Sequence, residues 1–217
     1  MKDFPPIYIV TIAELAYRRS KTEDQFTRLG LKPIWVEGIN AMRLGIKSFI
    51  PHELCRDNTP IYVHPTVLSI GINHYLTLMQ ALQEGAPEFF IMEDDVLLQG
   101  DFVQEWKAIR KSIPDAGIDI VQCTISGYED KPHERLNEHL CHYFYPFSAN
   151  CNWWRRTGAQ FAFEHFTPIS SPADVILATR VYPFIGHAVT VKRLAQDRNL
   201  TGLQTRWPST RILKEEK

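Results

Sequence analysis

Residues 88–95 read EFFIMEDD, an apolar run that ends in three consecutive acidic residues. Apolar residues that follow one another without alternation are typical of a strand buried on both faces of a sheet. In open α/β sheets, ligands bind at the edge formed by the carboxyl ends of the strands. The stretch therefore predicts a central strand over 88–92 that brings Glu93, Asp94 and Asp95 to a ligand-binding edge.

The segments before this stretch predict one half of a parallel sheet. Residues 7–12 read IYIVTI and residues 33–37 read PIWVE, and both are typical of strands. Between them, residues 17–29 favour a helix that ends at Gly30. A strand, a helix and a strand in this order indicate parallel pairing with a right-handed crossover. A longer helix is expected over 66–82, after an irregular stretch.

The segments after it continue the same alternation. A helix is predicted over 101–113 and a strand over 118–123. In the second half we expect a strand over 158–163, a short helix that begins near Pro172, and a weaker strand over 184–191. The whole pattern predicts an α/β fold with one sheet flanked by helices.

The composition excludes one class of protein. The chain has 24 Lys and Arg against 25 Asp and Glu, a net charge of −1, which excludes a globally basic nucleic-acid coat. Residues 186–217 hold seven basic and three acidic residues, a net +4, so this basic C-terminal segment can contact a nucleic acid or a membrane surface, or remain a solvated end. No stretch approaches the roughly 20 apolar residues of a membrane span. We expect a cytoplasmic protein with no transmembrane segment and with free thiols.

The acidic stretch itself points to a cation. Adjacent carboxylates repel and raise each other's pKa unless a cation neutralises them. Hard oxygen ligands suit Mg²⁺ or Mn²⁺, which usually combine one or two carboxylates with substrate phosphates. Side chains of an extended chain alternate, which places Glu93 and Asp95 on one side and Asp94 on the other. A metal–diphosphate site is therefore predicted, with a solvated acidic turn as the alternative.

These features resemble glycosyltransferase family 25, which includes lipooligosaccharide and procollagen galactosyltransferases. The motifs that carry the resemblance are Arg18-Arg19, Asn73-His74, Glu93-Asp94-Asp95, Gly158-Ala159-Gln160 and Pro172-Ala173-Asp174. The chain departs from the family pattern where Thr11-Ile12 replaces Asn-Leu, where Glu14-Leu15 replaces arginines, and where Ser69-Ile70 replaces Gly-Cys.

The resemblance implies a GT-A-like fold, a Rossmann-type mixed sheet flanked by helices with a smaller irregular acceptor lobe. It implies a single domain over 1–217, with a nucleotide-sugar half over about 1–125 and an acceptor half over about 126–217. The implied reaction moves a sugar from a nucleotide-diphosphate sugar to an acceptor hydroxyl, with inversion and with Mn²⁺ or Mg²⁺. The acceptor is left open between a saccharide, a protein side chain and a modified nucleobase.

The resemblance also assigns roles to individual residues. Asp95, Glu93 and His187 would hold the metal, and Asp95 would be the principal ligand. Asp174 would be the general base, with Asp94, Glu129, Asp130 and Glu164 as competitors. The residues that would contact the donor are Thr11, Arg18, Arg19, His74 and Glu93. Each has a structural alternative, such as a solvated helix face for the arginines or a favourable helix N-terminal charge for Asp174.

We further expect a cleft with residues 93–95 on one side and Asp174 on the other, together with Trp153 or Trp154. If the acceptor is DNA, Arg155 and Arg156 should line its rim. Two other functions remain open: an inactive binding module that keeps the fold, and a different metal enzyme acting on phosphates, such as a nucleotidyltransferase or a phosphohydrolase.

Overall fold

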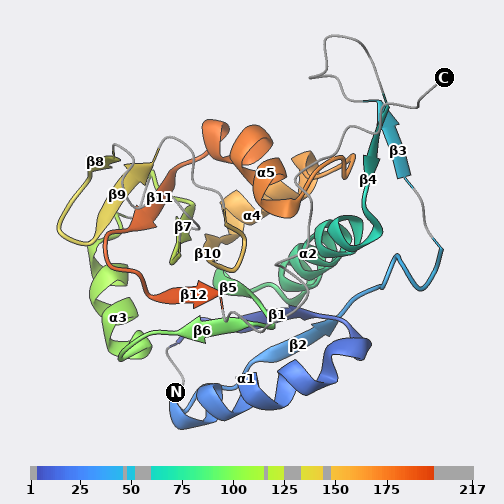
Figure 1. Ribbon diagram of the computed structural model, residues 1–217. Coiled ribbons are helices and arrows are strands. Elements are labelled where there is room, and N and C mark those ends of the chain that lie inside the picture. The colour runs from blue at the N-terminus through green and yellow to red at the C-terminus, as the bar shows by residue number, and fades with distance from the viewer. Residues whose placement is uncertain are drawn as a thin grey trace.

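A computed structural model of the protein describes residues 4–45, 48–51, 60–114, 117–124, 133–143 and 148–197. Its centre is an eight-stranded mixed sheet with the strand order β2-β1-β5-β10-β7-β11-β9-β8. Helices flank this sheet (Figure 1). The predicted α/β fold, a mixed sheet flanked by helices, is therefore confirmed.

The first half of the sheet matches the predicted order of elements. Strand β1 (Ile7–Thr11) pairs in parallel with β2 (Ile34–Glu37) on one side and with β5 (Glu88–Glu93) on the other. Helix α1 (Ala16–Arg28) follows a 3-10 turn η1 (Ala13–Leu15) and connects β1 to β2. Helix α2 (Pro65–Glu84) precedes β5. The carboxyl ends of β1, β2 and β5 therefore meet at one edge of the sheet.

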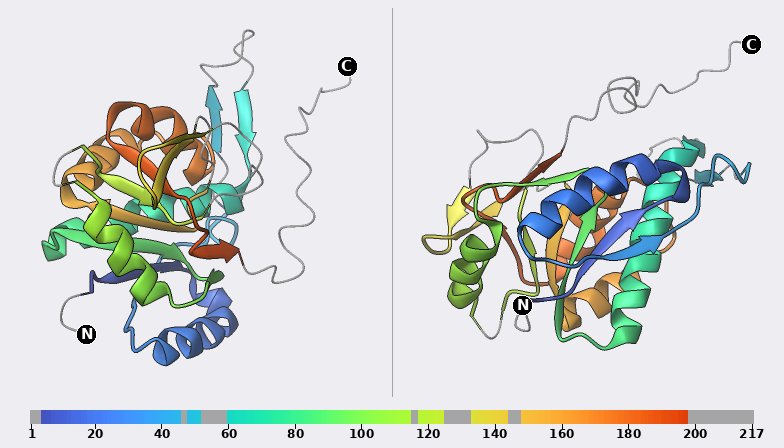
Figure 2. Two further views of the ribbon diagram at one scale, coloured as in Figure 1. Left: turned by 90° about the vertical axis from the view of Figure 1, so that its left-hand side faces the viewer. Right: turned by 90° about the horizontal axis from the view of Figure 1, so that it is seen from below.

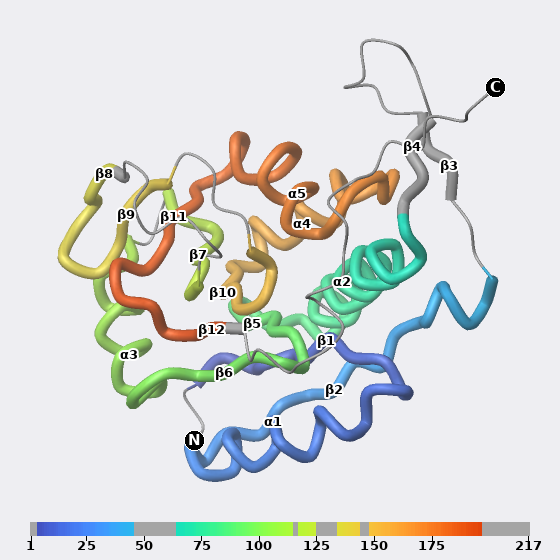
Figure 3. Tube along the Cα trace, viewed as in Figure 1, coloured from blue at the N-terminus to red at the C-terminus, as the bar shows by residue number. Residues whose placement is uncertain are grey.

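The second half of the chain is built into the same sheet. After β7 (Ile120–Gln122), the chain forms β8 (His133–Arg135) and β9 (Leu140–Tyr143) at the far edge. It then returns as β10 (Cys151–Arg155), antiparallel to both β5 and β7 (Figure 3). Strand β11 (His187–Thr190) pairs in parallel with β7. The two halves of the sequence thus share one sheet.

Two short ribbons and three more helices complete the described chain. The ribbons pair β3 (Ser48–Pro51) with β4 (Pro60–Val63), within the stretch expected to be irregular, and β6 (Val96–Leu98) with β12 (Ala195–Asp197). The helices are α3 (Phe102–Ser112), α4 (Arg156–His165) and α5 (Ala173–Ile176). Helix α5 continues through a π-helical segment (Leu177–Val181) and a 3-10 turn (Tyr182–Phe184).

The strand predicted over residues 158–163 is wrong, because this segment belongs to helix α4. Ala159 and Ala162 are buried, whereas Gln160 and Glu164 are exposed. Buried positions three apart indicate a helical period rather than the alternation of a strand. A Cβ atom on Gly158 would approach the backbone oxygen of Asp119 to 2.9 Å, so glycine allows the helix to pack closely against the chain before β7.

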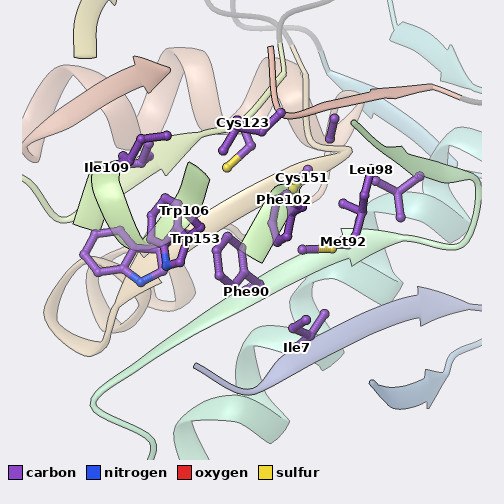
Figure 4. Close-up of a cluster of buried hydrophobic side chains, with 14 of the residues drawn as sticks. Ile7, Phe90, Met92, Leu98, Phe102, Trp106, Ile109, Cys123, Cys151 and Trp153 are labelled. Carbon is purple, nitrogen blue, oxygen red and sulfur yellow. The ribbon is translucent and has the colours of Figure 1, made fainter. Parts of the chain in front are cut away.

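The core consists of two layers, one on each face of the sheet. Helices α1 and α3 lie on one face of the sheet, and α2, α4 and α5 lie on the other (Figures 1 and 2). Their buried side chains form the two layers. Trp153 belongs to the first layer and Trp154 to the second, and both are buried (Figure 4 labels Trp153). The expectation that one of them faces a ligand is therefore wrong, because both fill the core.

Among the described helices, none combines the length and the apolar character needed to cross a membrane.

Candidate active site

The three acidic residues lie where β5 ends and the chain turns. Glu93 is the last residue of the strand, and Asp94 and Asp95 form the turn that leads into β6. The predicted pairing of Glu93 with Asp95 on one side is wrong, because the extended backbone stops at Glu93. Instead Asp94 and Asp95 contact the same partner, Arg18, and Glu93 contacts His74.

The guanidinium of Arg18 bridges the two aspartates. Its Nη1 atom lies 3.1 Å from Asp94 Oδ1 and 3.3 Å from Asp95 Oδ2. All three residues are buried, with exposed fractions of 8% for Arg18, 5% for Asp94 and 3% for Asp95. Burial raises the pKa of Asp94 above its usual value, although hydrogen bonds from Thr11 and Arg18 oppose that shift. The acidic turn is thus a buried ion cluster and not a solvated turn.

Neighbouring elements hold the turn in place. Thr11, at the end of β1, donates from Oγ1 to Asp94 Oδ2 at 2.7 Å. Thr22 donates to the backbone oxygen of Asp94 at 2.7 Å, and Asn150 donates from Nδ2 to Asp95 Oδ1 at 3.2 Å. Thr11 was predicted to contact the donor, but in this structure its hydroxyl positions Asp94.

Helix α1 supplies a buried polar face to this site. Gln25 donates from Nε2 to Val96 O at 2.9 Å and accepts from Leu98 N at 3.0 Å. Arg18, Thr22 and Gln25 follow one another at intervals of four and three residues, which places them on one face of a helix. We did not single out Thr22, Gln25 or Asn150 from the sequence, although the helical spacing is a signal for the first two.

A second group of ionisable side chains lies around Glu93. His74 of α2 is buried, and its Nε2 atom lies 3.1 Å from Glu93 Oε1. Asp174 of α5 accepts a hydrogen bond from the backbone N–H of Val175 at 2.9 Å. Burial raises the pKa of Asp174, and the nearby charge of Glu93 raises it further. Asp174 is therefore within electrostatic range of Glu93 and His74, and its role as the base stays a prediction.

Two further polar groups border this region. Asn150 Oδ1 and Asn152 Oδ1 are buried and have no hydrogen-bond partner in the described part of the chain. Burial raises the pKa of Tyr182, and the charge of Asp174 raises it further. These two amide oxygens are buried acceptors that no described protein atom pairs with, which is a cost to the folded state.

The structure does not place His187 at the acidic turn, and its prediction as a metal ligand is corrected. Its Nε2 atom pairs with Gln122 Oε1 at 2.9 Å, and its ring stacks on Tyr182 at 4.1 Å. Burial lowers the pKa of His187 to about 3. His187 begins β11, which runs parallel to β7, so it lies toward the edge of the sheet opposite the end of β5.

Arg19 lies apart from the ion cluster. It contacts Glu23 at 3.0 Å and Glu37 at 3.2 Å, and it covers the ring of Trp35 at 4.9 Å. Its predicted contact with the donor stays a prediction. Glu129 and Asp130, which were competitors for the role of base, lie outside the described residues, as does the basic C-terminal segment from residue 198 onward.

The expectation that Arg155 and Arg156 line the same cleft is wrong. Arg155 is aligned with Glu88, the first residue of β5, and therefore lies at the end of that strand opposite Glu93. Both arginines border a different pocket of about 500 Å³, whose lining residues include Glu88, Arg110 and Asp119. The antiparallel direction of β10 explains this, because its carboxyl end points away from the acidic turn.

The predicted divalent cation can be compared with the chemistry of the side chains at the acidic turn. The described ranges contain no group of three or more His, Cys, Asp or Glu side chains that could hold a metal ion. Asp94 and Asp95 nevertheless place two buried carboxylates around one cationic group, the guanidinium of Arg18. Mg²⁺ and Mn²⁺ accept one or two carboxylates when substrate phosphates supply further ligands, so the chemistry of this pair suits either ion.

Solved structures that resemble this chain include a glycosyltransferase and a viral protein. No family model matches the chain, and no curated protein has a significantly similar sequence. A glycosyltransferase involved in the glycosylation of the major capsid of PBCV-1 is similar with a TM-score of 0.48 and 14% identity, over 85% of this chain and 81% of that chain. A197 from STIV is similar with a TM-score of 0.46 and 11% identity, over 86% of this chain and 81% of that one. Membership of glycosyltransferase family 25 stays a prediction, and the function proposed below rests on the site.

Proposed function

We propose that the protein is a glycosyltransferase that moves a sugar from a nucleotide-diphosphate sugar to an acceptor hydroxyl, with inversion at the anomeric carbon. One observation carries this proposal. Two buried aspartates, Asp94 and Asp95, surround Arg18 at the carboxyl end of β5, and the adjacent Glu93 is within electrostatic range of a further carboxylate, Asp174. The carboxyl ends of sheet strands are the usual place for a nucleotide in α/β proteins, and a raised pKa suits a general base.

The donor would bind at the acidic turn. Asp95 and Asp94 would hold a Mn²⁺ or Mg²⁺ ion together with the diphosphate, and the bound ion would stabilise the charge of the leaving nucleoside diphosphate. Arg18 and Arg19 would add charge-assisted hydrogen bonds to phosphate oxygens. Thr11 and Asn150 keep the two carboxylates in position.

The acceptor would bind on the Asp174 side. Asp174 takes the proton of the acceptor hydroxyl as that oxygen attacks the anomeric carbon. Glu93, fixed by His74, lies close enough to keep the pKa of Asp174 raised. A saccharide, a protein side chain and a modified nucleobase all present a suitable hydroxyl, and a cytoplasmic location suits each of them.

The test is incubation of the protein with Mn²⁺, a panel of nucleotide sugars and mixed acceptors, followed by quantification of the released nucleoside diphosphate. We expect release from at least one donor, and its loss in the Asp174→Asn variant while that variant still binds the donor. Donor binding without turnover would support an inactive binding module instead. Turnover of nucleoside triphosphates rather than nucleotide sugars would support a nucleotidyltransferase or a phosphohydrolase.

A further inference from the structure

The contact between Arg18 and the aspartates is looser than its burial suggests. A single nitrogen, Nη1, serves both carboxylates at 3.1 and 3.3 Å. Charge-assisted N–H···O bonds are usually about 2.7–2.9 Å long, and arginine often uses two nitrogens in parallel. The Nε atom of Arg18 is buried and has no hydrogen-bond partner among the described residues. The guanidinium therefore neutralises the pair without satisfying its own hydrogen-bonding capacity.

We propose that Arg18 occupies, in the donor-free protein, the place that a divalent cation takes when the donor binds, so that guanidinium and metal exclude each other. This inference rests on the proposed function for the identity of the metal's partner, a nucleoside diphosphate. It concerns Arg18 itself, which changes partner from the carboxylates to the diphosphate.

The charges explain why both cations cannot stay. Two ionised aspartates, Asp94 and Asp95, carry two negative charges, and the single positive charge of Arg18 compensates one of them. A divalent ion placed between the carboxylates would neutralise both and would lie only a few ångströms from the guanidinium. Two cations this close repel each other, and the double charge of the metal ion doubles the repulsion expected between unit charges. The arriving ion therefore displaces the guanidinium.

The displaced guanidinium needs a new anionic partner, and the donor supplies one. The other buried groups at the turn, Thr11, Thr22 and Asn150, already donate to the aspartates and offer no negative charge. A diphosphate next to the metal carries the charge and the oxygen geometry that arginine binds best. Metal and nucleotide should consequently bind together, and the metal alone should bind weakly.

The experiment measures Mn²⁺ binding by electron paramagnetic resonance of the free ion, without any sugar donor. We expect the Arg18→Met variant to bind Mn²⁺ at least about tenfold more tightly than the wild type, a difference of about 1.4 kcal/mol. Arg28→Met is the matched control, because Arg28 is an exposed arginine on the same helix and donates to the backbone oxygen of Asp24 instead. We expect this control to bind Mn²⁺ as the wild type does.

A second arm adds UDP, GDP or ADP to the same titration. At least one nucleotide should increase Mn²⁺ affinity in the wild type, and by a larger factor than in Arg18→Met, because the variant has no guanidinium to displace. Equal Mn²⁺ affinity of the wild type and a folded Arg18→Met variant would overturn the inference. Because the first arm contains no donor sugar, its outcome is independent of whether glycosyl transfer is ever observed.

A further variant keeps the test decisive if Arg18→Met does not fold, since two buried carboxylates then lack a counter-ion. Arg18→Lys keeps the charge on a shorter side chain without the planar fork of arginine. We expect the Mn²⁺ affinity of Arg18→Lys to be at least about threefold higher than that of the wild type. The reason is that a lysine ammonium binds the two carboxylates less strongly and is displaced more easily. Wild-type affinity in a folded Arg18→Lys variant would overturn the inference.

Discussion

The raised pKa of Asp174 lowers the stability of the folded protein at neutral pH and favours the proposed chemistry. Burial and the charge of Glu93 raise the pKa of Asp174, so its ionised form is disfavoured in the folded protein. A raised folded-state pKa contributes stability below the unfolded-state pKa, and this contribution is lost as the pH rises through the folded-state value. The same shift brings a general base closer to its operating pH.

We therefore predict that Asp174→Asn lowers the rate of transfer by about 10²–10⁴-fold, the usual contribution of a general base. The free energy of unfolding of Asp174→Asn minus that of the wild type should be larger near neutral pH than at about pH 3. At pH 3 an aspartate is protonated in both the folded and the unfolded state. Urea titrations at both pH values and nucleoside diphosphate release measure the two effects. In the wild type, the acid limb of the pH–rate profile should lie above the usual pKa of an aspartate.

The matched control for this substitution is Glu164→Gln. Glu164 is exposed on α4, and it was itself a candidate for the base. We expect it to keep wild-type rates and a pH-independent difference in stability. A rate loss in Glu164→Gln, together with normal rates in Asp174→Asn, would reverse the assignment.

We predict that the hydroxyl of Thr11 stabilises the acidic turn. Its hydroxyl donates to Asp94 Oδ2 at 2.7 Å inside the buried cluster. Thr11→Val keeps the shape but leaves that oxygen without this donor, which should lower the free energy of unfolding by about 1–3 kcal/mol. Thr11→Ser restores a hydroxyl and should recover most of the loss. Denaturant unfolding of the two variants checks this, and equal stability of Val and Ser would contradict it.

Among the elements, helix α1 is joined to β6, the strand that follows the acidic turn. Gln25 bonds both Val96 O and Leu98 N of β6. Gln25→Leu fits a buried position but leaves two backbone groups unpaired, so we predict a loss of about 1–3 kcal/mol for each group. Gln80→Leu on α2 is the control, because Gln80 bonds only the exposed side chain of Glu84. Thermal unfolding of both variants measures the difference, and similar losses would show that Gln25 does not anchor β6.

The pattern of apolar residues predicted most elements of the first half. It failed in a short segment where the helical period and the alternation of a strand could not be told apart. Six elements lie within a few residues of their expected positions, because long apolar runs and glycine or proline boundaries define them: β1, α1, β2, α2, β5 and α3. The short strands β3, β4 and β6 were not expected. In the segment that became α4, a short stretch with Gly158 and two phenylalanines favoured a strand. Packing of Ala159 and Ala162 against the sheet decided for the helix.

Across the whole molecule, the position of the acidic turn could be predicted from the sequence, and its partners in the second half only in part. Asp174 was expected opposite the turn, and Glu93 does influence its pKa. His187, Arg155 and Trp153 were misplaced because their positions depend on the antiparallel insertion of β10 between β5 and β7. Such pairing joins segments far apart in the chain and has no local signal.

The most direct test of the proposed function is calorimetric titration of the wild type and Asp95→Asn with a panel of nucleotide-diphosphate sugars in the presence of Mn²⁺. Asp95 loses one negative charge in this variant, and the single amide oxygen can accept from Asn150 or from Arg18 but not from both. We predict that the wild type binds at least one donor and that Asp95→Asn, shown to be folded by circular dichroism, binds it at least about tenfold more weakly. Failure of the folded wild type to bind any donor, or equal binding by Asp95→Asn, would contradict a donor site at the acidic turn.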